Sequence, residues 1–165
     1  MIYIVLSICF IYATLILLYR ISWNKISESK EVNYNDTVSV VVACRNEEQN
    51  IKNLIKDIMN QNFDKYRFQM IIVDDHSEDK TLEILYKESE KWTNLHIVSM
   101  HDDEIGKKNA IRKGVGIANG DVILCTDADC RVGGDWIKIM LSCFTKKRIK
   151  FVAGLVKFSS ENTFL

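Results

Sequence analysis

The 165-residue chain has no proline and no net charge, since 22 Lys and Arg balance 22 Asp and Glu. The absence of proline excludes Pro-rich linkers, and the absence of a basic excess argues against a nucleic-acid partner. Five cysteines without metal-ligand spacing argue against a disulfide scaffold or a zinc module, so we expect reduced, packed thiols. With 47% hydrophobic and 27% charged residues, the composition is typical of about one folded domain.

Charge is also missing from the start of the chain, where the run from Met1 to Tyr19 is uncharged. A helix of that length spans about 28 Å, close to the hydrocarbon thickness of a bilayer. No basic residue precedes the run, which favours a retained transmembrane anchor over residues 1–20 rather than a cleaved signal peptide or a buried core helix. Residues 21–37 are then a polar juxtamembrane tether. Arg20 and Lys25 predict that the rest of the chain lies on the cytoplasmic side.

From residue 38 onward, strand-like and helix-like patterns alternate. Runs of β-branched or apolar residues predict strands, and apolar residues at i, i+3, i+4 and i+7 predict helices. The predicted strands are residues 38–43, 70–73, 95–98, 121–126 and 151–158. The predicted helices are 51–59, a helix around Leu82, Leu85 and Tyr86 that Ser77 could cap, 107–118 and 136–144. Strands separated by helices imply parallel βαβ crossovers, so we predict an α/β fold with helices on both faces of a mostly parallel sheet.

The ends of the predicted strands carry the polar residues that could do chemistry, because ligands of open α/β sheets bind outside the carboxyl ends of the strands. The segments there are Arg45-Asn46-Glu47, Asp74-Asp75 and Asp127-Ala128-Asp129. Two carboxylates placed by a buried strand suit Mg²⁺ or Mn²⁺. Acidic turns are also common on surfaces. The alternative for Asp74-Asp75 is a helix-capping role, in which Asp75, Ser77 or Asp79 satisfies free N–H groups of the following helix.

A further helix begins at Gly106-Lys107-Lys108, where backbone N–H groups and a lysine suit a phosphate. The alternative is a solvated basic face, which we favour for Lys108 and Lys113. The sequence contains neither Gly-x-Ser-x-Gly nor a Walker-type Gly-Lys-Ser/Thr, and no Gly-x-Gly-x-x-Gly follows the first strand. A nicotinamide or P-loop function therefore has no support.

Taken together, these segments resemble the family 2 glycosyltransferases. The opening strand with its Arg45-Asn46-Glu47 turn, the Val73-Asp74-Asp75-His76-Ser77-Glu78-Asp79 segment, the Gly106-Lys107-Lys108-Asn109-Ala110 helix start and the Asp127-Ala128-Asp129 motif occur in the family's order. The resemblance covers residues 38 to about 156, so residues 38–165 are expected to be the N-terminal, donor-binding part of a GT-A domain. Membrane-anchored members of this family also carry an N-terminal span.

The resemblance implies a nucleotide-diphosphate sugar donor and a divalent cation, Mn²⁺ or Mg²⁺. Carried over by position, Asp75 would contact the nucleotide base, and Ala43, Arg45 and Glu47 would line the nucleoside pocket. Lys107 would lie near the ribose or the phosphates, Asp127 would face the ribose or the donor sugar, and Asp129 would hold the metal against the diphosphate. The implied activity is an inverting, metal-dependent sugar transfer to an unidentified acceptor, in cell-envelope polysaccharide or glycolipid synthesis.

Two substitutions and one absence depart from the family pattern. Ala43 stands where many members have proline, and Arg112 stands where many have asparagine. The family places its catalytic base on a later helix, whereas Glu161 is the only carboxylate after Asp135 here and lies in a polar tail. We therefore expect a chain truncated before the base, which leaves open a non-catalytic, membrane-anchored nucleotide-binding remnant. A phosphoacceptor receiver domain is a third alternative, but its acidic pair follows the first strand rather than the second.

Overall fold

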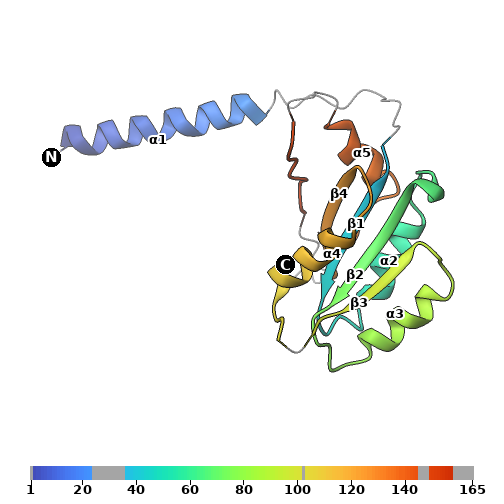
Figure 1. The fold of residues 1–165 in the computed structure, drawn as a ribbon. Coiled ribbons are helices and arrows are strands. Elements are labelled where there is room, and N and C mark those ends of the chain that lie inside the picture. The colour runs from blue at the N-terminus through green and yellow to red at the C-terminus, as the bar shows by residue number, and fades with distance from the viewer. Residues whose placement is uncertain (1, 24–35, 102, 145–148, 158–165) are drawn as a thin grey trace, which may run out of the picture. The chain divides into compact units, whose positions relative to one another are not determined.

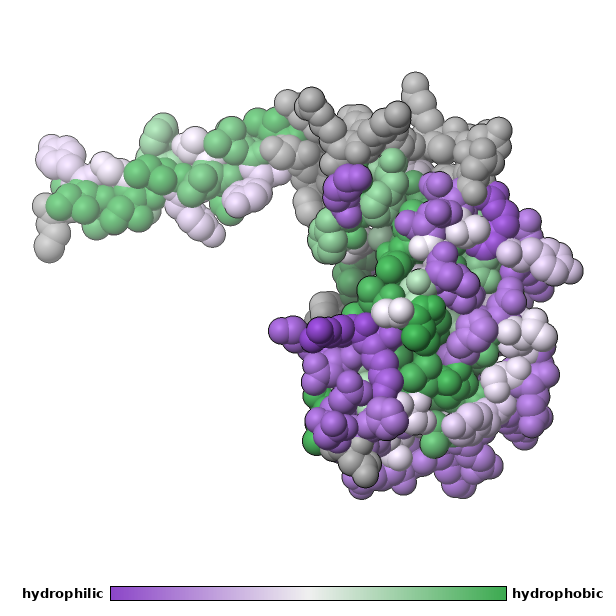
Figure 2. All heavy atoms as spheres, in the orientation of Figure 1, coloured by the Kyte–Doolittle hydropathy of each residue, from purple (hydrophilic) through white to green (hydrophobic). Residues whose placement is uncertain are grey.

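The computed structural model describes residues 2–23, 36–101, 103–144 and 149–157, and the chain divides into two compact units, residues 1–31 and 32–165. The first unit contains helix α1 (Ile2–Trp23), whose residues Ile2–Ile21 are long and apolar enough to cross a membrane. Apolar side chains cover most of α1, whereas polar side chains cover much of the visible face of the second unit (Figure 2). The helix continues past the predicted anchor at residue 20 because no glycine or proline interrupts the next turn.

The second unit is built on a four-stranded parallel sheet with the order β3-β2-β1-β4 (Figure 1). The strands are β1 (Val38–Cys44), β2 (Phe68–Asp74), β3 (Leu95–Ser99) and β4 (Val122–Asp127). In register, Val38 of β1 pairs with Phe68 of β2 and with Val122 of β4. The chain therefore adds β2 and β3 on one side of β1 and returns to add β4 on the other side. This reversal is a topological switch point, where open α/β sheets bind their ligands.

Helices cover both faces of the sheet, because successive side chains of β1 point to opposite faces and almost all of them are buried. Val40 and Val42 face α2 (Ile51–Met59), α3 (Thr81–Ser89) and α5 (Trp136–Ser142), whereas Val41 faces α4 (Lys107–Ile117). Helix α2 buries its whole apolar stripe, namely Ile51, Leu54, Ile55 and Ile58. Burial of each such side chain contributes about 2 kcal/mol. A short 3₁₀ helix, η1 (Lys65–Arg67), precedes β2.

Four predicted strands and four predicted helices of this unit are confirmed, but two local predictions are wrong. Residues 151–157 form no strand, and Phe151, Leu155 and Val156 are strongly exposed. Their apolar pattern favours extended backbone, but within the described residues no neighbouring strand pairs with them, and an unpaired strand is not stable. The choice of Ser77 as the cap is also wrong, because α3 begins at Thr81 and Ser77 lies four residues before it.

Candidate functional site

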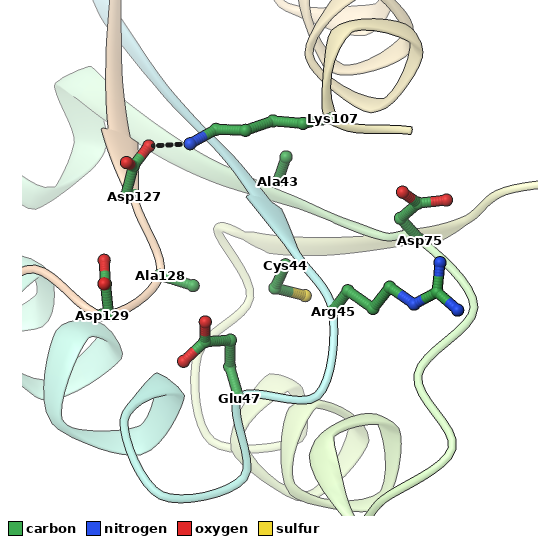
Figure 3. Close-up of a pocket in the computed structure, with 9 residues that line it drawn as sticks. All are labelled: Ala43, Cys44, Arg45, Glu47, Asp75, Lys107, Asp127, Ala128 and Asp129. Atoms are coloured by element: carbon green, nitrogen blue, oxygen red, sulfur yellow. Dashed lines mark ion pairs between the residues drawn. The ribbon is translucent and has the colours of Figure 1, made fainter. Parts of the chain in front are cut away.

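A pocket of about 220 Å³ lies at the carboxyl ends of β1 and β4, at the switch point of the sheet. Nine residues line it, and they come from the ends of β1 and β4, from the turn after each of the strands β1, β2 and β4, and from the start of α4 (Figure 3). All seven residues singled out from the sequence are among them: Ala43, Arg45, Glu47, Asp75, Lys107, Asp127 and Asp129. Residues as far apart in the sequence as 43 and 129 therefore line the same pocket. The role of each residue stays a prediction.

The two neighbouring carboxylates at the end of β2, Asp74 and Asp75, have separate tasks. Asp74 is buried, and its Oδ2 accepts a hydrogen bond from the Ser77 backbone N–H at 3.2 Å. Asp75 faces the pocket, where its Oδ2 accepts from the Gly106 N–H at 3.0 Å and its Oδ1 lies 3.1 Å from His76 Nδ1. Asp74 thus organises the turn, whereas Asp75 is the carboxylate available to a ligand.

Asp75 is held in its ionised form. Burial raises the pKa of its carboxyl, but the hydrogen bonds from His76 and from the Gly106 N–H outweigh burial, so the pKa lies below its ordinary value. Gly106 can place its N–H there because its φ is 100°, a conformation that side-chain-bearing residues rarely adopt. An ionised carboxylate only accepts hydrogen bonds, and its lone pairs leave room for a ligand N–H or hydroxyl.

Reciprocal hydrogen bonds lock the turn after β1 to the turn after β2. The Asn46 N–H donates to Ser77 Oγ at 2.9 Å, and the Glu78 N–H donates to Asn46 Oδ1 at 2.8 Å. Asn46 adopts a φ of 56° and His76 a φ of 60°, so both turns hold left-handed backbone beside the pocket. This locking was not foreseen from the sequence, where these polar residues were interpreted separately as pocket lining and helix caps.

Asp79 belongs to the same locked pair of turns. Its Oδ1 accepts from the Thr81 N–H, the first residue of α3, and its Oδ2 accepts from the Glu48 N–H at 3.1 Å. Asp79 therefore takes the capping role that the sequence offered to Asp75, Ser77 or Asp79. The Ser77 hydroxyl instead receives the Asn46 N–H.

The only ion pair between residues that line the pocket within the described chain joins Lys107 to Asp127. Lys107 Nζ lies 2.7 Å from Asp127 Oδ1, and both side chains are more than half exposed (Figure 3). The pair reaches across the pocket from the first residue of α4 to the last residue of β4. An exposed ion pair of this kind contributes at most about 1 kcal/mol, so phosphate or metal can displace it.

Carboxylates outnumber basic residues around the pocket. Glu47, Asp75, Asp127 and Asp129 face Arg45 and Lys107, which leaves an excess of two negative charges. Within the described chain, no group of three or more His, Cys, Asp and Glu side chains has metal-binding geometry. One or two carboxylates with water and phosphate oxygens are nonetheless the ordinary ligands of Mg²⁺. The Asp129 carboxylate therefore fits a hard divalent cation bound together with phosphate oxygens.

Cys44 and Ala128 also line the pocket and were not singled out as ligand-binding residues. Burial, followed by the nearby carboxylate of Asp74, raises the pKa of the Cys44 thiol well above its ordinary value. The sulfur therefore stays protonated and is a poor metal ligand or nucleophile. Adjacency to Ala43, Arg45, Asp127 and Asp129 was the signal that could have identified both residues. Glu161, the weak candidate for a base, lies outside the described residues.

Comparisons with known proteins agree on one family. Residues 39–165 match the family model described as glycosyl transferase family 2. The glycosyltransferase AglE of Haloferax volcanii is 28% identical over 125 residues, which are 76% of this chain and 41% of that protein.

Solved structures support the same fold. The mannosyltransferase PcManGT of Pyrobaculum calidifontis, in complex with GDP-Man and Mn²⁺, superposes with a TM-score of 0.71 at 21% identity, covering 87% of this chain and 43% of that one. S. aureus TarS 1–349 in complex with UDP-GlcNAc gives a TM-score of 0.59 at 26% identity, covering 64% of this chain and 30% of that one. The chain thus spans less than half of each of these three proteins.

Proposed function

Because this chain belongs to glycosyltransferase family 2, we propose that its pocket binds the nucleotide diphosphate of a sugar donor and that the protein transfers this sugar with inversion. The observation that carries the proposal is the convergence of four separate segments on one pocket at the switch point of the sheet. A nucleotide diphosphate needs hydrogen-bond acceptors for its base and neutralising charge for its phosphates. Asp75 offers the acceptor, and Lys107 together with a divalent cation held by Asp129 would supply the neutralising charge.

Asp75 and Arg45 lie on one side of the pocket, and Asp127 and Asp129 lie on the other (Figure 3). We assign Asp75 to the base, because its hydrogen bonds with Gly106 and His76 fix the direction in which its remaining lone pairs point. Ala43, Arg45 and Glu47 line the nucleoside end. The small side chain of Ala43 leaves space for a ring at the carboxyl ends of β1 and β4.

The diphosphate is assigned to the end of the pocket that Lys107, Asp127 and Asp129 form. Lys107 exchanges its exposed partner Asp127 for phosphate oxygens, and Asp127 is then free to accept from a ribose or sugar hydroxyl. Asp129 holds Mn²⁺ or Mg²⁺ against the diphosphate. When bound, the cation neutralises the charge that develops on the departing nucleoside diphosphate.

We further propose that α1 anchors the protein in a membrane, with residues after 20 on the cytoplasmic side. The length and hydropathy of Ile2–Ile21 support the anchor, and Arg20 and Lys25 support the orientation. A catalytic domain tethered to the cytoplasmic face would meet lipid-linked or growing polysaccharide acceptors, so we place the reaction in cell-envelope polysaccharide or glycolipid synthesis.

The test measures nucleotide binding to the full chain in detergent micelles by titration calorimetry, with UDP, GDP, UDP-GlcNAc and GDP-Man, each with Mn²⁺ or with EDTA. We expect one nucleotide series to bind more tightly with Mn²⁺. Asp129→Asn is expected to abolish the Mn²⁺ effect, whereas Glu90→Gln, which removes one exposed negative charge at the end of α3, is expected to preserve it. Absence of binding, or a Mn²⁺ effect that survives in Asp129→Asn, contradicts the proposal.

A further inference from the structure

The segment after the Asp127-Ala128-Asp129 motif is held by the carboxyl-terminal end of α2, a part of the chain that contributes nothing to the pocket. Arg131 donates from Nε to Asp57 Oδ2 at 2.6 Å and from Nη2 to Asp57 Oδ1 at 3.0 Å. The same Asp57 Oδ2 accepts from the Val132 backbone N–H at 3.3 Å. One carboxylate on α2 therefore holds both a side chain and the backbone of this segment.

Gln61 extends the attachment. It is buried, and its Nε2 donates to the Gly133 carbonyl at 2.7 Å while its Oε1 accepts from the Ile137 N–H at 3.0 Å. The Asn62 backbone N–H also donates to the Gly134 carbonyl at 2.7 Å. The residues from 131 to 137 thus follow the end of α2 through several hydrogen bonds, and no residue of this end of α2 lines the pocket.

Asp129 lies between two fixed points. On its amino-terminal side, Ala128 is buried in the core that α2 and α5 share with the sheet. On its carboxyl-terminal side, Arg131 is held by Asp57 two residues away. Without Asp57, the nearest point after Asp129 that this end of α2 holds is Gly133, through Gln61. Among the described residues, the turn around Asp129 is then held locally only by the hydrogen bond from the Cys130 N–H to the Asp127 carbonyl. A metal site loses affinity when the groups that orient its ligands are removed, typically by 10- to 100-fold.

We propose that Asp57 and Arg131 are positioning residues that fix the direction of the Asp129 carboxylate toward the metal and diphosphate; this rests on the function proposed above. The pair is a forked, charge-assisted contact, the geometry that fixes an orientation best. Hydrogen bonds from Arg131 hold the pKa of Asp57 below its ordinary value, so the carboxylate is charged at neutral pH. The Asp57 side chain is 14% exposed and that of Arg131 is 65% exposed, so the carboxylate is the shielded partner of the contact.

The experiment separates metal-dependent from metal-independent nucleotide binding in the full chain in detergent micelles. The probe is the nucleoside diphosphate, UDP or GDP, that the wild-type chain binds, titrated with Mn²⁺ or with EDTA. In Asp57→Asn and in Arg131→Gln, we expect the Mn²⁺-dependent gain in affinity to fall about tenfold. Affinity in EDTA is expected to stay within about twofold of wild type, because the residues assigned to the base and ribose are untouched.

Three further measurements decide whether the effect arises from positioning. The double variant is expected to lose little more than either single variant, because both remove the same contact. Glu88→Gln on α3 is the matched control, since it breaks a comparable ion pair, Glu88 with Lys91 at 2.7 Å, away from the pocket. Hydrogen exchange of the Val132 amide, measured without metal or nucleotide, is expected to accelerate in Asp57→Asn but not in Glu88→Gln.

The outcomes separate the two proposals. If the wild-type chain binds nucleotide with a Mn²⁺ effect that persists in Asp57→Asn, the positioning role is overturned and the proposed function stands. If affinities with Mn²⁺ and with EDTA fall equally in Asp57→Asn, the pair is merely structural, and the positioning role is again overturned. If the wild-type chain binds no nucleotide, the proposed function is overturned, and the positioning role with it.

Discussion

A glycine pair on α4 provides a sharp test of how the helix that carries Lys107 is seated. A Cβ added at Gly114 would lie 2.6 Å from Val41 Cγ1 and 3.1 Å from Val73 Cγ2, whereas a Cβ added at Gly116 would meet nothing within 4 Å. Both positions lie in the same helix, so Gly114→Ala and Gly116→Ala change the unfolded chain alike. The difference in stability between the two variants therefore isolates the packing of α4 on β1 and β2.

The expected magnitude follows from the distances. Carbon atoms in contact lie about 3.5–4.0 Å apart, so the new methyl at position 114 must displace α4 or Val41 by about 1 Å. Val41 is fully buried on a central strand and β-branched, so its side chain has little freedom to move. Overpacking of this kind costs about 1–3 kcal/mol. Replacing glycine with alanine raises helix propensity by up to about 1 kcal/mol in both variants, so this gain cancels in the difference between them.

The assay is urea denaturation of the full chain in detergent micelles, followed by tryptophan fluorescence. With a slope of about 2 kcal/mol per molar urea, Gly114→Ala is expected to unfold about 0.5–1.5 M earlier than Gly116→Ala. Nucleotide binding is expected to weaken only in Gly114→Ala, because a displaced α4 moves the Gly106 N–H away from Asp75. An equal or higher midpoint for Gly114→Ala would refute the packing of α4 described here.

Three further outcomes follow from contacts elsewhere in the second unit. Gly120→Ala is expected to destabilise the fold by about 3 kcal/mol in urea denaturation, because its Cβ would lie 2.6 Å from the backbone nitrogen of Ser39, which cannot yield as a side chain can. Asp57→Asn is expected to lower the free energy of unfolding by about 1 kcal/mol near neutral pH. Since folding lowers the pKa of Asp57, the difference in unfolding free energy between wild type and variant should shrink as the pH falls below about 3.8. A difference that does not change with pH would exclude the charge of Asp57 as its source. In a variant that retains only Cys44, the buried thiol is expected to react with Ellman's reagent at pH 8 only after unfolding, and rapid reaction in the folded state would contradict its burial.

Much of the site could be predicted from the sequence because the parallel sheet brings all strand ends to one edge. The apolar runs before Asp74 and Asp127 predict buried strands, whose ends determine where the following residues lie. This is confirmed for β2, whereas β4 is an edge strand of the described sheet and exposes Ile123 and Cys125. The order of the motifs along the chain is that of the family 2 glycosyltransferases. Nothing in the local pattern showed that Asp74 turns inward while Asp75 faces the pocket, because that choice depends on the Gly106 N–H, which arrives from a segment 31 residues away.

The wrong predictions have the same cause. The apolar residues of 151–157 carry strand propensity, but a strand exists only where another backbone pairs with it, and propensity does not supply that partner. Ser77 has the right chemistry for a helix cap, but the Asn46 N–H from the turn after β1 uses its hydroxyl. In each case a tertiary contact decided between local options that the sequence left equal.

The amino-acid sequence by itself determined the apolar amino-terminal helix, the alternation of strands and helices and the set of residues at the strand ends, because these follow from periodicity and charge along the chain. Only the tertiary structure decided how the turns after β1 and β2 lock together and how α2 holds the segment after Asp129. Those contacts join residues such as Asp57 and Arg131, 74 positions apart, and pairing at that distance is determined by the packing of helices on the sheet rather than by any local pattern.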